Sequence, residues 1–390
     1  MAIGAAITGI GMSRIGRNLH RPAMDLLLDA AMEAMADAGL SRDDIDGIST
    51  YPGRTTVAPG MSPLGTGEVR NALGLNTRWH SATPEGPAQM SAIMVAAMAV
   101  ATGQARHVLC FRALTESSSQ TAAQRASVPT GGGGRIGGWL GYLLPVGAIS
   151  ATNWMAWVAT RYMHEYGLTR EQLGALAVGQ RTFAQANPRA LFRGKPLALE
   201  DYLAARMIST PLGLLDCDIP IDGACVIIVS AADAARDCAK APLSIEAMSA
   251  AMRGKESWDQ QPDLTRMAAH DAGADLWSRT ALTPADVDVL ALYDGFSIQI
   301  PLWIEALGFC GQGEAAGFIA DGHPLAGGRF PVNTGGGQLS AGRLHGFGLL
   351  HEACVQLWGE GGGRQVPDAR VAACGMGGGP LAGAMLLVRQ

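Results

Sequence analysis

The chain has 390 residues, of which 48% are hydrophobic and 16% are charged, and its formal net charge is −5. This length and apolar content predict two or three domains, or one large α/β unit, with a substantial buried core. The acidic balance gives no basic surface for nucleic acid or an anionic membrane, and no uncharged apolar run reaches the roughly 18 residues of a membrane span.

The cysteines and the N-terminus indicate a compartment. Seven cysteines, an odd number without a Cys-x-x-Cys pair, predict a reduced protein with mostly buried thiols. The first residues resemble a strand and lack the basic region and long apolar core of a signal peptide. We therefore expect a cytoplasmic protein.

The first half of the chain reads as alternating strands and helices. A strand at 5–10 precedes a helix at 23–38, whose apolar residues follow helical spacing and which Gly39 is suited to end. A capped turn with an Asp-Ile-Asp step at 40–48 then leads into another strand.

Two of these patterns recur later in the chain. The turn at 40–48 is echoed at 282–290, and a helix–glycine–strand unit at 87–110 is echoed by the segment from 347 to 374. Such recurrence predicts two similar halves in which helices cover sheets.

A long region at 114–215 separates the halves. It contains Ser/Thr-rich and Gly-rich segments, a helical stretch at 154–166 and a Thr169-x-x-Gln172 capping box. Since a compact domain rarely keeps so many residues as plain loop, we expect a mostly helical region that covers a binding site. The predicted division is therefore an N-terminal half at 1–113 with 216–240, a covering region at 114–215 and a C-terminal half at 241–390.

Several catalytic templates do not occur in the sequence. There is no H-E-x-x-H, paired-cysteine metal motif, G-x-S-x-G or P-loop. Gly132-x-Gly134-x-x-Gly137 has the spacing of a dinucleotide fingerprint but follows no clear strand, so we interpret it as a substrate-covering loop. We expect no metal and no permanently bound cofactor.

Two segments have the composition of anion-binding loops. Pro87 suits the first position of a helix, Gly86 permits close backbone approach, and the free N–H groups of that first turn face an anion. The glycine-rich run at 333–346 leads into an apolar helix and is also suited to present N–H groups. It contains His345, either a catalytic imidazole or a ring hydrogen-bonded to backbone.

Two further segments carry reactive side chains. Tyr293 and Asp294 run off the end of a strand, the usual place for functional groups in an α/β protein. The alternative is a packed tyrosine and a helix-capping aspartate. Cys374 precedes the glycines Gly377, Gly378 and Gly379, and is either an acid/base or a small core residue.

Together these segments resemble the thiolase superfamily. The run N-T-G-G-G-Q-L-S-A-G-R-L-H-G at 333–346 is similar to the thiolase loop N-x-x-G-G-x-x-x-x-G-H-P, with Arg343 at the position of the catalytic His. Y-D-G-F at 293–296 resembles N-E-A-F or H-D-C-F, and the segment after Cys374 resembles C-x-G-G-G-x-G. Counting back from Gly103 to the thiolase nucleophile reaches Gly86, so the cysteine nucleophile is missing.

The branch that matches best is the lipid-transfer-protein or sterol-carrier-thiolase branch, and within it the bacterial steroid side-chain aldolases. Their loop reads G-G-Q-L-S-x-G-Y-I-H-G, from which this chain departs by Arg343 in place of the tyrosine. They also lack the nucleophilic cysteine and use the tyrosine of Y-D-x-F. The resemblance implies an α/β fold: a duplicated, five-layered αβαβα architecture with a helical loop insertion.

The implied reaction is retro-aldol cleavage of a β-hydroxyacyl-CoA with a steroid or other bulky apolar chain. Coenzyme A enters only as part of the substrate thioester. Tyr293 is the expected proton-transfer group, and Arg343 is the expected cation that lowers its pKa. Backbone N–H groups at Gly86, Gly377, Gly378 and Gly379 are the expected oxyanion donors. Asp294, His345 and Cys374 complete the candidate catalytic set.

The departure at Arg343 leaves other functions open. They are a non-catalytic acyl-CoA-binding homologue, a subunit of a larger complex, and an acetyl-CoA acyltransferase that uses displaced residues such as Cys374 and His345. By analogy we expect a homodimer, together with a small zinc-ribbon/OB-fold partner protein that completes the site.

Overall fold

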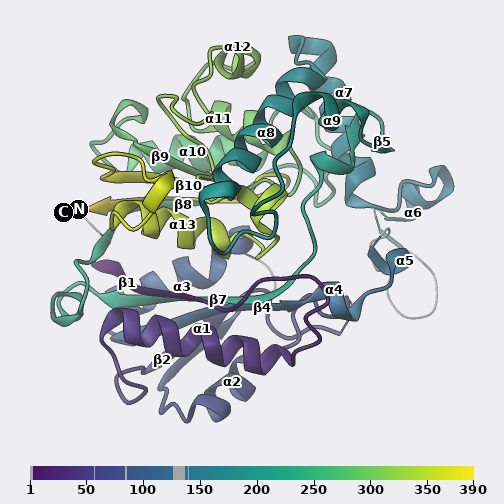
Figure 1. The fold of residues 1–390 in the computed structure, drawn as a ribbon. Helices are drawn as coiled ribbons and strands as arrows, with labels where there is room; N and C mark the ends of the chain where they lie inside the picture. The colour runs from purple at the N-terminus through teal and green to yellow at the C-terminus, as the bar shows by residue number, and fades with distance from the viewer. Residues whose placement is uncertain (1–2, 57, 84–85, 126–136, 139) are drawn as a thin grey trace.

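The protein is described by a computed structural model covering residues 3–56, 58–83, 86–125, 137–138 and 140–390 (Figure 1). Gly132 and Gly134 of the fingerprint-like segment lie outside these residues.

The N-terminal half opens with β1 (Ala5–Met12) and α1 (Ala23–Ala38), and the helix confirms the predicted bounds. Helix α1 buries the stripe given by its apolar spacing, and Gly39 ends it with φ 68°. The other elements of this half are β2 (Gly47–Thr50), α2 (Thr66–Leu73), β3 (Trp79–Ala82), α3 (Ser91–Ala101), β4 (His107–Thr115) and β7 (Asp222–Ala231).

The C-terminal half repeats this plan. It begins with a long strand, β8 (Leu243–Met252), followed by a helix, α10 (Ala268–Ser278). Its other elements are β9 (Val289–Leu292), α11 (Gln299–Ala306), α12 (Ala315–Ala320), α13 (Phe347–Leu357), β10 (Val371–Gly377) and β11 (Leu381–Arg389).

The strand pairing shows the duplication. The order is β3-β2-β4-β7-β1 in one half and β8-β11-β10-β9 in the other. Each half has a parallel pair, β2 with β4 or β9 with β10, followed by antiparallel neighbours. Strands β1 and β8 join the halves into one mixed nine-stranded sheet through only two residue pairs, Ala6 with Ser244 and Ile7 with Leu243.

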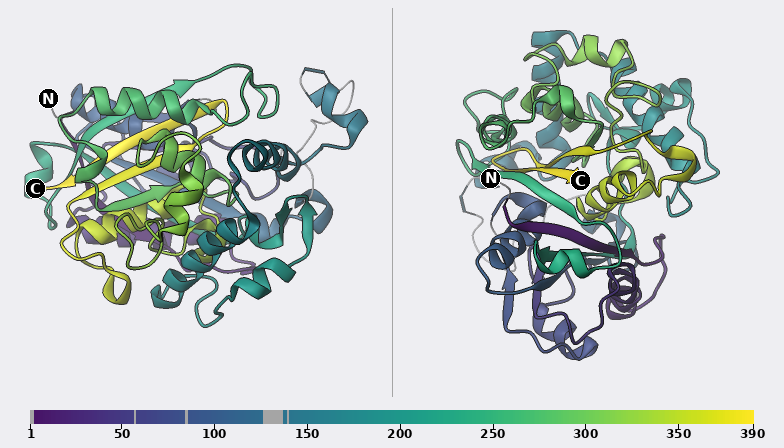
Figure 2. Two further views of the ribbon diagram at one scale, coloured as in Figure 1. Left: turned by 90° about the horizontal axis from the view of Figure 1, so that it is seen from above. Right: turned by 90° about the vertical axis from the view of Figure 1, so that its left-hand side faces the viewer.

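The layers follow from which face each helix covers. Helix α1 packs on one face of β7 and β4 in a core of its own, whereas α3 lies on the opposite face. Helix α13 contacts β9 and β10 of one half and β7 and β1 of the other, so it lies between the half-sheets, while α10 and α11 cover the far side (Figures 1 and 2). The expected thiolase-like α/β architecture of five layers is confirmed.

The region between the halves is mostly helical in its described part. It contains α4 (Glu116–Ser119), α5 (Ala122–Arg125), α6 (Leu140–Leu143), α7 (Ala151–Tyr166), α8 (Arg170–Ala186), α9 (Leu199–Ala204) and the hairpin of β5 (Met207–Ser209) with β6 (Leu212–Gly213). Thr169 and Gln172 form the predicted capping box of α8. Helix α8 packs on the glycine-rich loop (Figure 1). None of the described helices has the length and apolarity needed to cross a bilayer.

Candidate functional site

Four predicted segments converge where β9 ends. The N–H of Tyr293 donates to the carbonyl of Gly375 in β10 at 2.8 Å. The N–H of Gln338, in the π-helical turn Gly337–Ala341, donates to Asp294 at 2.9 Å. A Cβ on Gly346 would lie 3.1 Å from Cβ of Gln89, so the end of this loop touches the segment that enters α3.

A fifth segment, residues 216–219, ties the others together. The N–H of Asp218 donates to the carbonyl of Gly295 at 3.0 Å, and that of Ile219 donates to the carbonyl of Gln338 at 3.3 Å. The N–H of Arg343 in turn donates to the carbonyl of Ile219 at 2.9 Å. Asp218 was not among the predicted site residues.

Arg343 is held by two carboxylates. Its Nη2 lies 2.6 Å from Oε2 of Glu116, and its Nη1 lies 3.4 Å from Oδ1 of Asp218. Burial opposes the charge of Arg343, yet Asp218 and Glu116 together raise the pKa of its guanidinium, so it stays cationic. The side chains of Arg343 and Asp218 are 21% and 13% exposed, which places them toward solvent relative to Tyr293.

Tyr293 does not become the basic phenol that the sequence suggested. Burial and the charge of Asp218 raise its pKa, whereas Arg343 and the side chain of Gln338 act to lower it. The net shift is upward, so the expected effect of Arg343 is present but is outweighed. The Tyr293 hydroxyl therefore carries its proton at neutral pH.

Asp294 is fully buried beneath the glycine-rich turn. Burial raises its pKa to about 7, although the N–H of Gln338 acts to lower it. Its Oδ1 has no hydrogen-bond partner in the described part of the chain. Asp294 thus anchors the turn rather than capping a helix. It is the residue that directly follows Tyr293 in the sequence.

We expect Gly337→Ala to disrupt this anchor. Gly337 has φ 59°, and a Cβ there would overlap Oδ2 of Asp294 and lie 2.8 Å from Cδ of Gln180. The strained backbone and the overlap should lower the free energy of unfolding by about 1–3 kcal/mol and reduce turnover. Denaturant unfolding measures this loss. Gly67→Ala in α2, where a Cβ meets nothing within 4 Å, is the matched control and should not lower stability.

His345 is buried beside Tyr293 and bonded to an arginine that the sequence did not predict. Its ring centroid lies 6.5 Å from that of Tyr293 in an edge-on arrangement, and its Nδ1 lies 3.1 Å from Nη2 of Arg112. Burial and the charges of Arg112 and Arg343 lower the pKa of His345 well below its usual range. The observed partner of Nδ1 is therefore a side chain and not the backbone group expected in one of the two alternatives, and a catalytic role for the imidazole stays a prediction.

The predicted oxyanion glycines are not equivalent. A Cβ on Gly377 would lie 2.5 Å from that of Ala88, so the β10–β11 hairpin presses on the segment after Gly86. The N–H of Gly378, however, donates to the carbonyl of Leu381 at 3.0 Å to close this hairpin, which removes it as an oxyanion donor in this conformation. A Cβ on Gly379 would meet the Trp258 ring.

Cys374 lies in the core. It is fully buried in β10, near Cys354 of α13, and burial raises the pKa of its thiol to about 12. A thiol with this pKa supplies almost no thiolate at neutral pH. Among the described residues it has no hydrogen bond to Tyr293 or His345, and no group of three His, Cys, Asp or Glu side chains there could hold a metal.

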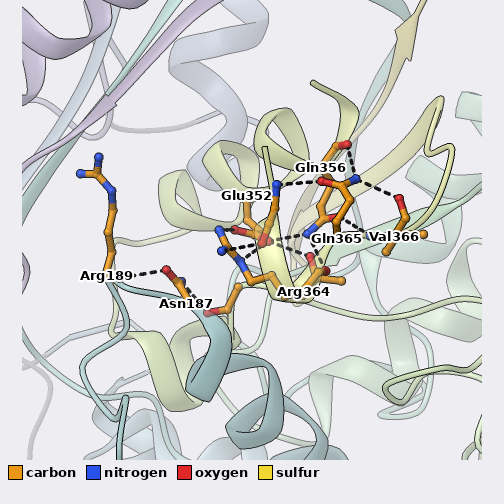
Figure 3. A network of polar contacts seen from close by, with 10 residues as sticks. Asn187, Arg189, Glu352, Gln356, Arg364, Gln365 and Val366 are labelled. Carbon is orange, nitrogen blue, oxygen red and sulfur yellow. Dashed lines mark hydrogen bonds and ion pairs between the residues drawn. The ribbon is translucent and has the colours of Figure 1, made fainter. Parts of the chain in front are cut away.

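A cavity of about 220 Å³ lies on the other side of the glycine-rich loop. Its wall includes Asn187, Arg189 and the buried ion pair of Glu352 with Arg364 (Figure 3). Glu352 also accepts a hydrogen bond from Thr334 at 2.9 Å, so this network holds the start of the loop.

Comparisons with known proteins show which family the chain belongs to. A family model described as thiolase C-terminal domain-like matches residues 250–389. A 17-hydroxy-3-oxo-4-pregnene-20-carboxyl-CoA lyase from Mycobacterium tuberculosis is 38% identical over 364 residues, which are 91% of this chain and 92% of that protein. The chain belongs to the thiolase superfamily. Within it, the chain is an enzyme of the aldolase type, a carbon–carbon lyase.

A second relative and a solved structure support this placement, and a third protein shares the fold. A steroid side-chain-cleaving aldolase from Thermomonospora curvata is 36% identical, covering 90% of this chain and 89% of that protein. The solved Ltp2-ChsH2(DUF35) aldolase superposes with a TM-score of 0.88 at 33% identity, over 99% of this chain and 98% of that one. Human mitochondrial 3-ketoacyl-CoA thiolase, with TM-score 0.71 and 14% identity over 99% of both chains, shares the fold.

Proposed function

We propose that this enzyme cleaves the Cα–Cβ bond of a β-hydroxyacyl-CoA by a retro-aldol reaction, without a cysteine nucleophile. The observation that carries the proposal is the convergence of Tyr293, Asp218 and His345 at a site where the segment entering α3 presents Gly86 and Ala88 instead of a thiol. Acyl transfer through a covalent enzyme intermediate needs a nucleophile, whereas aldol cleavage needs proton transfer and stabilisation of an enolate.

The proton moves between three groups. The β-hydroxyl gives its proton to Tyr293 while the proton of Tyr293 passes to the Asp218 carboxylate. The hydroxyl oxygen becomes a carbonyl as the Cα–Cβ bond breaks, and the electron pair moves to the thioester enolate. Tyr293 then protonates Cα, and Asp218 returns its proton to Tyr293. The cycle leaves both residues in their starting states.

The substrate class follows from the relatives. The Mycobacterium enzyme is named for a substrate with a 17-hydroxyl and a 20-carboxyl-CoA group, and the Thermomonospora enzyme for a steroid side chain. We propose a bulky apolar acyl chain of this kind, with coenzyme A present only as part of the thioester.

The test is incubation of the enzyme with β-hydroxyacyl-CoA esters, steroidal and aromatic, with and without free coenzyme A. The proposal expects a carbonyl product and a shortened acyl-CoA without added coenzyme A. Dependence on free coenzyme A would instead indicate thiolysis, and tight binding without products would indicate a non-catalytic homologue.

Cleavage should depend on the ionisation of Asp218. Burial raises the pKa of Asp218 to about 6, although Arg343 acts to lower it. The carboxylate accepts a proton only above this pKa, so kcat should fall as the pH drops below about 6. Asp218→Asn should lower kcat and remove this acidic limb, whereas Asp43→Asn, in the turn after α1 with a side chain that is 86% exposed, should keep it. An unchanged limb in Asp218→Asn would exclude Asp218 from proton transfer.

The assembly belongs to the proposal as well. Strand β3 is the edge of the sheet and exposes His80 and Ala82, which suits pairing with a second copy in a homodimer. The two-part name of the Ltp2-ChsH2(DUF35) aldolase supports a complex with a second protein, and we propose that this partner is a small zinc-ribbon/OB-fold protein that completes the site. We propose that the complex acts in the cytoplasm. Activity measured with and without a co-encoded OB-fold protein tests the partner.

A further inference from the structure

Arg112 is a buried cation with unused donors. It lies on β4 and is 1% exposed, and its Nη2 contacts Nδ1 of His345 at 3.1 Å. Its Nε and Nη1 have no hydrogen-bond partner in the part of the chain that the structure describes. Glu116 influences it electrostatically but is ion-paired with Arg343. Burying a charge that has no ion pair of its own costs stability, so Arg112 is not explained by the stability of the fold.

Arg112 also determines where His345 carries its proton. A guanidinium can only donate hydrogen bonds, so Nδ1 of His345 must be the acceptor. The charges that face this ring are Arg112 and Arg343, and both, together with burial, keep it neutral. A neutral imidazole with a bare Nδ1 carries its proton on Nε2. His345 is therefore a hydrogen-bond donor through Nε2, not a general base.

These donors lie beside the proton-transfer tyrosine. The rings of His345 and Tyr293 are 6.5 Å apart, and the charge of Arg112 acts on Tyr293 as well. In a β-hydroxyacyl thioester the hydroxyl-bearing carbon and the thioester carbonyl carbon are both bonded to Cα. Groups that serve the two oxygens must therefore lie side by side, as Tyr293 and the Arg112–His345 pair do.

We propose that Arg112 and His345 form the binding site for the enolate oxygen of the thioester, with Arg112 fixing His345 as an Nε2–H donor. This inference rests on the proposed retro-aldol reaction. As the Cα–Cβ bond breaks, its electron pair moves onto Cα and the thioester oxygen, where the donors bind the negative charge. Neither donor loses its proton, and the charge is discharged when Cα takes the proton of Tyr293.

Substitutions at His345 separate a donor from a base. A glutamine amide can place an N–H near the position of Nε2 but cannot act as a base, whereas asparagine and alanine cannot reach it. His345→Gln should therefore keep at least about 10-fold more kcat than His345→Ala, which should lose about 10²–10³-fold, as expected for a lost oxyanion donor. Equal loss in His345→Gln, His345→Asn and His345→Ala would overturn the donor role. His164→Gln, on the exposed end of α7, is the matched control.

Substitutions at Arg112 test the positioning role. Arg112→Met should lower kcat and kcat/KM equally, by about 10²-fold or more, because the interaction is made in the transition state. Arg112→Lys, which still donates to Nδ1, should recover part of this loss. Since the guanidinium has no ion-pair partner, Arg112→Met should unfold at a temperature no lower than the wild type. A rise in KM alone would overturn the proposal.

Two measurements do not depend on cleavage. In enzyme labelled with ¹⁵N-histidine at pH 7, the resonances that vanish in His345→Gln should show a protonated Nε2 and an unprotonated Nδ1. A protonated Nδ1 or an imidazolium would overturn the proposal even in an inactive enzyme.

Acetyl-CoA and propionyl-CoA in D₂O should exchange their Cα protons in the wild type and lose this exchange in Arg112→Met. Exchange without aldol cleavage would reject the proposed function but keep the enolate site, and exchange that survives in Arg112→Met would reject the site.

Discussion

Tyr293→Phe should lower kcat for carbon–carbon cleavage by roughly 10²-fold or more, because it removes the proton that burial keeps on the phenol. The change deletes one oxygen from a packed ring and should leave the fold intact. Steady-state kinetics with a β-hydroxyacyl-CoA, alongside a thermal unfolding curve, separates the two effects.

Tyr166→Phe is the matched control for this experiment. Tyr166 is a tyrosine of α7 whose hydroxyl accepts from Gln312 at 3.0 Å at the surface. Its loss should leave kcat unchanged. If Tyr293→Phe turned over as fast as Tyr166→Phe, Tyr293 would have no part in proton transfer, and Asp218 would have to take the hydroxyl proton directly.

Glu352→Ala should be among the most destabilising single substitutions in the chain. Arg364 donates to both oxygens of Glu352, from Nε at 2.9 Å and from Nη2 at 2.8 Å, and the two side chains are only 9% and 8% exposed (Figure 3). Gln356 also donates to this carboxylate at 2.9 Å. Its removal leaves the guanidinium of Arg364 without a carboxylate partner, with only the carbonyl of Gly361 still accepting from it at 3.0 Å, which should cost about 3–5 kcal/mol of unfolding free energy. Urea unfolding measures this cost.

Two further variants test whether the unpaired charge of Arg364 causes this loss of stability. Replacing both residues, as Glu352→Leu with Arg364→Met, should cost much less than the sum of the single changes, because no unpaired charge remains. Asp275→Ala breaks an exposed ion pair with Arg279 and should change stability by at most about 1 kcal/mol. A Glu352→Ala variant as stable as Asp275→Ala would contradict the assignment.

Local patterns sufficed for much of the fold. The periodic apolar residues of α1 and the capping box of α8 specify their own elements, so the predicted bounds and cap agree with the structure. The duplication could be recognised in the sequence because the equivalent turns at 40–48 and 282–290 need the same types of residue. The position of Tyr293 was predictable for a similar reason: a polar pair that directly follows a buried strand lies at the carboxyl end of that strand.

The rest of the site depends on contacts that no local pattern contains. Arg112 reads as one residue of a buried strand, and its partner His345 lies 233 positions away. In the sequence Asp218 looks like an ordinary loop residue, and only the folded chain, in which its N–H donates to the carbonyl of Gly295, places it at the site. The effect of Arg343 on Tyr293 was misjudged because burial, a property of the assembled fold, outweighs a single charge.

The pairing of β1 with β7 constrains how the chain is made. Ala5 pairs with Ala231, so the first strand of the protein stays without its neighbour until the whole covering region has left the ribosome. At roughly 5–20 residues per second this wait is on the order of tens of seconds. During that time the buried face of β1 and the parallel pair of β2 with β4 are exposed in the nascent chain. We therefore expect the nascent chain to need chaperones during synthesis. A circular permutant that begins at β7 should reach the folded state sooner after its synthesis ends.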